Sequence, residues 1–97
     1  MSNLADLRRR IDELDRQLVK LLNERSQCAL EIGKLKLEQS LRLYQPDREK
    51  EALENAERNN QGPLTDAAIR RLFERIIDEA RAAERHAMHP DGEEKDA

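Results

Sequence analysis

The chain has 97 residues, of which 40% are charged and 37% are hydrophobic, and its formal net charge is −3. This length fits one domain, and the scarcity of strand formers, with one Val and two aromatic residues, excludes an all-β fold. No apolar run approaches the ~20 residues that a transmembrane helix needs. The mild acidity argues against a nucleic-acid-binding protein, which usually carries a basic excess.

The cysteine content and the N-terminal residues bear on the compartment. The single cysteine, Cys28, cannot form an intrachain disulfide, and residues 1–11 contain no continuous apolar stretch of the kind found in signal peptides. We therefore expect a cytoplasmic protein. Because a small domain with few large apolar residues buries little surface on its own, we also expect at least a dimer.

The first third of the chain has a strong helical period. Apolar residues recur at spacings of three and four, at Leu4, Leu7, Ile11, Leu14, Leu18 and Leu21. The pattern continues to Leu35 and predicts one helix over about 4–39, capped by Ser2 or Asn3. Such a helix is roughly 50 Å long, whereas a compact domain of this size has a radius of gyration of about 13 Å. The helix therefore needs a partner along its length, and an identical chain is the simplest one.

Two shorter helices are predicted after a connector at 40–45. Pro46 suits the first position of a helix that runs to about residue 59, with Gln45 at a cap position where Asp or Asn would serve better. The Asn-Asn-Gln-Gly-Pro sequence at 59–63 predicts a stop and a turn. Thr65 then caps a third helix.

The third helix should run to about residue 87, because its apolar residues keep the helical period that far. We expect residues 1–87 to form the folded domain and residues 88–97 to be a disordered polar tail. The predicted fold class is all-α, with one long, one short and one medium helix.

Three basic residues interrupt or flank the first apolar stripe. Arg25 stands on the stripe itself, either as a snorkelling residue or structural ion pair, or as a buried cation that awaits an anionic ligand. Lys36 lies eleven residues later and points within about 20° of Arg25, although by itself it resembles an ordinary exposed lysine. Arg8 points about 100° away, so it can reach such a site only on a partner chain, or is simply solvated.

Carboxyl groups offer a second kind of chemistry. Glu84 falls on the apolar stripe of the third helix, either as a frayed terminal residue or as a semi-buried carboxyl whose pKa is raised and which can donate a hydrogen bond. Arg48 and Glu49 open the second helix, where an exposed first turn is the plain interpretation. Cys28 is expected to be a small core residue.

Other catalytic groups are scarce. His86 and His89 are three residues apart without further ligands, so no metal site is expected. The sequence contains no Gly-rich phosphate loop and no Ser-His-Asp set. If the chain is an enzyme, it is one that needs neither a nucleophile nor a cofactor.

The whole pattern resembles the helical, type II (AroQ class) chorismate mutases. The resemblance runs from about residue 4 to 86, and its most specific pieces are IDxLDxxLxxLLxERxxxxxxIGxxK, which begins at Ile11, and the PxRE box of Pro46, Arg48 and Glu49. It implies an intertwined homodimer of three-helix chains. It also implies the conversion of chorismate to prephenate by an intramolecular Claisen rearrangement, a step in phenylalanine and tyrosine biosynthesis that needs no cofactor or metal.

The same resemblance implies roles for particular residues. Arg25 and the partner subunit's Arg8 would clamp the two substrate carboxylates, and Lys36 would lie beside the ether oxygen. Arg48 would be a further cation near a carboxylate. Glu49 would accept the hydrogen of the ring hydroxyl.

Three positions depart from the family pattern. Gln45 stands where many members have Asp, which weakens the helix cap more than the site, because that position can contact substrate through its backbone amide. Ala80 stands where some members have Ser near a carboxylate, so that contact is missing. Glu84 stands where others have Gln as a second donor to the ether oxygen, and only a protonated Glu can donate.

Two alternative functions remain open. One is an isochorismate-pyruvate lyase of the same fold, which would act on a sister substrate with the same cations. The other is a non-enzymatic dimeric helical interaction module, which explains the apolar stripe but not Arg25 within it. The sequence leaves open whether the domain acts alone, belongs to a fusion or docks on another enzyme.

Overall fold

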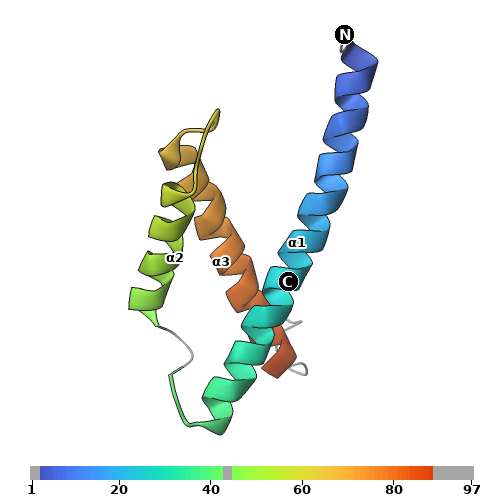
Figure 1. The fold of residues 1–97 in the computed structure, drawn as a ribbon. Coiled ribbons are helices and arrows are strands. Elements are labelled where there is room, and N and C mark those ends of the chain that lie inside the picture. The colour runs from blue at the N-terminus through green and yellow to red at the C-terminus, as the bar shows by residue number, and fades with distance from the viewer. Residues whose placement is uncertain (1–2, 43–44, 89–97) are drawn as a thin grey trace.

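The computed structural model describes residues 3–42 and 45–88, and within them it has three helices and no strand (Figure 1). The helices are α1 (Leu4–Glu38), α2 (Pro46–Arg58) and α3 (Asp66–Met88). Each ends within a residue of its predicted end, so the all-α prediction is confirmed. Met88 is the last residue of α3, and the rest of the expected polar tail lies outside the described residues.

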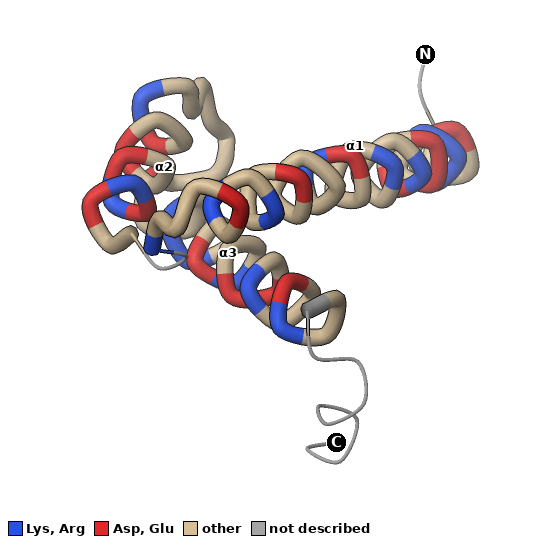
Figure 2. The backbone as a smooth tube through the Cα atoms, turned by 90° about the horizontal axis from the view of Figure 1, so that it is seen from below, with Lys and Arg blue, Asp and Glu red and all other residues tan. Residues whose placement is uncertain are grey.

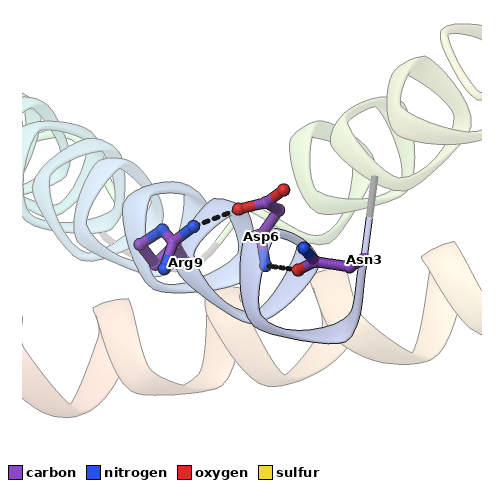
Figure 3. Close-up of polar contacts among 3 residues, drawn as sticks. All are labelled: Asn3, Asp6 and Arg9. Atoms are coloured by element: carbon purple, nitrogen blue, oxygen red, sulfur yellow. Dashed lines mark hydrogen bonds and ion pairs between the residues drawn. The ribbon is translucent and has the colours of Figure 1, made fainter. Parts of the chain in front are cut away.

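Local side-chain chemistry sets where the helices begin. The Oδ1 atom of Asn3 accepts a hydrogen bond from the backbone N–H of Asp6 at 2.9 Å, and Asp6 in turn pairs with Arg9 (Figure 3). Gln45 makes no side-chain cap bond, and α2 relies on Pro46 in its first turn instead. Thr65 Oγ1 accepts from the N–H of Ala68 at 3.1 Å and so caps α3.

The turn between α2 and α3 is held by Asn60. Its side-chain nitrogen donates to the carbonyl of Leu64 and to Oδ1 of Asp66, both at 2.8 Å, and its oxygen accepts from the N–H of Gly62 at 3.1 Å. Gly62 has φ of 75°, in the left-handed region that glycine adopts without strain. The turn sends α3 back alongside α2 (Figure 1).

Helix α3 packs against both α2 and α1, whereas the N-terminal half of α1 extends away from the other helices (Figures 1 and 2). Its apolar side chains are therefore exposed, as with Leu7 at 52% and Leu18 at 55%. Among the described residues, Ala80 and Gly33 alone are buried. The radius of gyration is 16.8 Å, against about 13 Å for a compact domain. The single chain thus leaves a long apolar stripe without a partner.

None of its described helices combines the length and apolar content needed to cross a membrane.

Candidate active site

A cavity of about 270 Å³ lies between the three helices. The C-terminal half of α1 lines it with Arg25, Cys28, Ala29, Ile32, Gly33 and Lys36. The beginning of α2 and its cap contribute Gln45, Arg48, Glu49 and Ala52. Helix α3 contributes Ile77, Ala80, Arg81 and Glu84. Cationic side chains outnumber acidic ones four to two in this lining, so the cavity suits an anionic ligand.

The cavity unites all but one of the residues predicted to form a site. They are Arg25, Lys36, Gln45, Arg48, Glu49, Ala80 and Glu84. The exception is Arg8, which is exposed in the second turn of α1, on the half that extends away from α2 and α3. Within one chain, therefore, Arg8 does not join the site.

Helical geometry explains why two cations of α1 face the same cavity. Arg25 and Lys36 are eleven residues apart, close to three full turns, and both are partly buried. Among the described residues, the Arg25 guanidinium has no hydrogen-bond or ion-pair partner. The interpretation of Arg25 as a structural ion pair within the chain is therefore not supported. A partly buried, unpaired cation that lines a cavity is instead suited to bind an anion.

The two predicted residues of α2 differ in their contacts. Arg48 is exposed and lines the cavity. Its Nη1 also lies 3.3 Å from Oε1 of Glu51 on the same helix. Glu49 is more buried, and its Oε2 lies 3.4 Å from Nη1 of Arg81 on α3. Nη2 of Arg81 lies 2.7 Å from Oδ1 of Asp78. Arg81 is a cavity residue that the sequence analysis missed, although its position beside Ala80 and three residues before Glu84 could have indicated it.

Glu84 is a semi-buried carboxyl that lines the cavity. Its partial burial raises its pKa above the ordinary value, and the nearby negative charge of Glu49 adds to this effect. The positive charges of Lys36 and Arg81 act in the opposite direction without cancelling the rise. This direction agrees with the alternative of a semi-buried carboxyl, and the protonated form that can donate a hydrogen bond persists to a higher pH than in an exposed glutamate.

One residue of the cavity was misjudged from the sequence. Cys28 was expected in the core, but its side chain is exposed and lines the cavity. The apolar stripe of α1 does continue through position 28, but in one chain this part of the stripe faces the cavity and not a packed helix. In the part of the chain that the structure describes, no three His, Cys, Asp or Glu side chains gather in a way that could hold a metal ion.

Comparison with known proteins identifies the relatives of this chain. The profile of the family described as chorismate mutase type II matches residues 7–85. The form II structure of chorismate mutase from Thermus thermophilus matches with a TM-score of 0.82 and 36% identity, over 86% of this chain and 94% of that one. The form I structure of the same protein matches with a TM-score of 0.78 and 37% identity, over 81% and 99% of the two chains.

Longer proteins also contain a similar segment. A bifunctional chorismate mutase/prephenate dehydratase of Neisseria gonorrhoeae (strain ATCC 700825 / FA 1090) is 41% identical over 78 residues, which cover 80% of this chain and 21% of that protein. The chain spans about a fifth to a quarter of the length of the bifunctional relatives that it matches. Since the family match covers most of the chain and the three-helix fold agrees with it, the chain belongs to the type II chorismate mutase family.

Proposed function

We propose that this chain catalyses the rearrangement of chorismate to prephenate, in the biosynthesis of aromatic amino acids. The observation that carries the proposal is the convergence of Arg25, Lys36 and Glu84 on one cavity, in a chain of the chorismate mutase family. Chorismate carries two carboxylates and an ether oxygen. The cavity offers cations for the carboxylates and hydrogen-bond donors for the ether oxygen.

The reaction makes a C–C bond while the ether C–O bond breaks within one molecule, so no group is transferred to the protein. Catalysis then consists of holding a compact reactive conformer and stabilising negative charge on the ether oxygen. Arg25 binds one carboxylate with its planar fork, and Arg48 adds positive charge near a carboxylate at the cavity mouth. Lys36 and protonated Glu84 donate to the ether oxygen. Glu49 accepts the hydrogen of the ring hydroxyl.

Residues 1–87 form the catalytic domain in this proposal, and two copies assemble as an intertwined homodimer in the cytoplasm. The exposed apolar stripe of α1 supports the dimer, because its burial against an identical chain would stabilise both copies. The place of Arg8 also supports it. Arg8 lies on the half of α1 that extends away from its own cavity, so it is available to the cavity of the second copy. Arg8 of the partner subunit then binds the second carboxylate.

The proposed dimer can be tested by measuring the molar mass of the protein in solution. Analytical ultracentrifugation of the parent should give twice the chain mass. Ile11→Lys places a charge on the exposed stripe and should shift the protein toward monomer, with a parallel loss of activity. A parent that stays monomeric at micromolar concentration while turning over chorismate contradicts the shared site.

The activity is tested by loss of chorismate absorbance and chromatographic detection of prephenate. Parent protein should consume chorismate and yield prephenate, whereas Arg25→Ala protein with an unchanged circular dichroism spectrum should do so at least about 30-fold more slowly. Isochorismate is the comparison substrate. Faster release of pyruvate from isochorismate than formation of prephenate from chorismate would assign the chain to the lyase reaction, and no turnover of either would favour the interaction module.

A further inference from the structure

Arg81 is the charged cavity residue to which the family resemblance gives no role. It lies on α3 between Ala80 and Glu84, and it lines the cavity. The Arg81 side chain is 38% exposed and that of Glu49 is 27% exposed, so their ion pair is partly shielded from water. Arg81 is therefore part of the site, although its side chain stays partly exposed.

The contacts of Arg81 join two helices. Its Nη1 lies 3.4 Å from Oε2 of Glu49 on α2, and its Nη2 lies 2.7 Å from Oδ1 of Asp78, one turn earlier on α3. A guanidinium presents its donors in a rigid planar fork, so fixing one edge on Asp78 restricts the direction of the other edge. Asp78 thus orients Arg81 toward Glu49. The neighbouring Arg48 pairs with Glu51.

We propose that Arg81 is a positioning residue, which holds the Glu49 carboxylate turned into the cavity, ready to accept the hydrogen of a substrate hydroxyl. This inference rests on the proposed function, because it assigns Glu49 to the hydroxyl. The ion pair uses Oε2 of Glu49, and in this proposal Oε1 is the oxygen that meets the substrate hydroxyl. A carboxylate that is free to rotate would spend part of its time away from that hydroxyl, and misplacement of this kind reduces turnover.

Arg81 also influences Glu84. The charged groups that surround the cavity are Arg25 and Lys36 on α1, Arg48 and Glu49 on α2, and Arg81 on α3. Arg81 lowers the pKa of Glu84, whereas Glu49 raises it. Removing the Arg81 charge while Glu49 remains should therefore raise the pKa of Glu84 further. The protonated, donating form of Glu84 would then persist to higher pH.

The test is a double-mutant cycle on kcat/KM for chorismate, with the full chain. Arg81→Gln should lower kcat/KM about 10-fold in the parent and less than about 2-fold in a Glu49→Gln background, because Arg81 acts through Glu49. Arg81→Lys should lie closer to the parent than Arg81→Gln. Equal losses in the two backgrounds, or no loss in the parent, would overturn the proposal.

Two further variants separate positioning from folding. Arg75→Gln removes a matched ion pair of α3, in which Arg75 and Glu79 lie 2.7 Å apart outside the cavity, and should leave kcat/KM unchanged. Asp78→Asn removes only the orienting carboxylate and should cause a smaller loss, which disappears in the Glu49→Gln background. Additive effects of Asp78→Asn and Glu49→Gln would also overturn the proposal.

A pH profile provides the second readout. The alkaline limb of kcat/KM for Arg81→Gln should move to higher pH than that of the parent, because the positive charge of Arg81 lowers the pKa of Glu84. Loss of the structural pair in Arg75→Gln, which lies outside the cavity, should leave the limb unmoved. An unmoved limb for Arg81→Gln, or one moved to lower pH, contradicts the proposal. A parent that does not turn over chorismate refutes the proposed function itself, and this result is visible before any variant is compared.

Discussion

Replacement of Arg25 by alanine should remove activity while leaving the fold intact. The guanidinium lines the cavity and, among the described residues, makes no hydrogen bond or ion pair, so its loss leaves no protein group unpaired. Truncating one member of a buried, hydrogen-bonded charge pair costs about 2–5 kcal/mol. If substrate completes such a pair, kcat/KM should fall by roughly 30-fold to several thousand-fold, since 1.36 kcal/mol corresponds to a factor of ten.

The assay is steady-state loss of chorismate absorbance, together with thermal unfolding of each variant. The matched control is Arg16→Ala, which removes an exposed arginine of the same helix outside the cavity and should change neither quantity. The unfolding midpoint of Arg25→Ala should equal that of the parent or exceed it, because an unpaired, partly buried charge does not stabilise the free protein. Near-normal kcat/KM with a collapsed midpoint would show that Arg25 is structural and would refute this reasoning.

Three other outcomes are expected. Mixing inactive Arg8→Ala chains with inactive Arg25→Ala chains should restore activity, because each heterodimer keeps one intact site; verified heterodimers without activity contradict the shared site. Parent kcat/KM should fall as pH rises through the raised pKa of Glu84, because the carboxylate that forms repels the negative charge on the ether oxygen. The Glu84→Gln variant does not titrate at this position and should keep its activity at high pH. Parallel profiles between about pH 5 and 9 would remove Glu84 from the mechanism. Ser40→Gly should stabilise the fold by about 0.5–1 kcal/mol in chemical denaturation, because Ser40 has φ of 58° after the end of α1. This left-handed conformation costs a residue with a side chain about 1–2 kcal/mol, and the greater chain entropy that glycine loses on folding offsets part of the gain.

The helices could be predicted from the sequence because their causes are local. Apolar spacings of three and four defined α1, and Asn3, Pro46 and Thr65 marked where the helices begin. Local geometry also placed Arg25 and Lys36 on one face, since eleven residues make three turns of any straight helix. The apolar stripe of α3 likewise indicated a partly buried Glu84. The roles of Arg48 and Glu49 came from the family resemblance and not from periodicity.

Relations between helices were decided by the tertiary structure. Periodicity shows which face of a helix is apolar, but not which element covers it. For that reason the sequence shows one continuous apolar stripe from Leu4 to Leu35. In the folded chain, the first half of this stripe is uncovered and Cys28 is exposed at a cavity. The pair between Arg81 and Glu49 joins residues 32 positions apart, and no local pattern encodes it. It exists because the Asn60 turn returns α3 beside α2, which brings a guanidinium on one helix within reach of a carboxylate on the other.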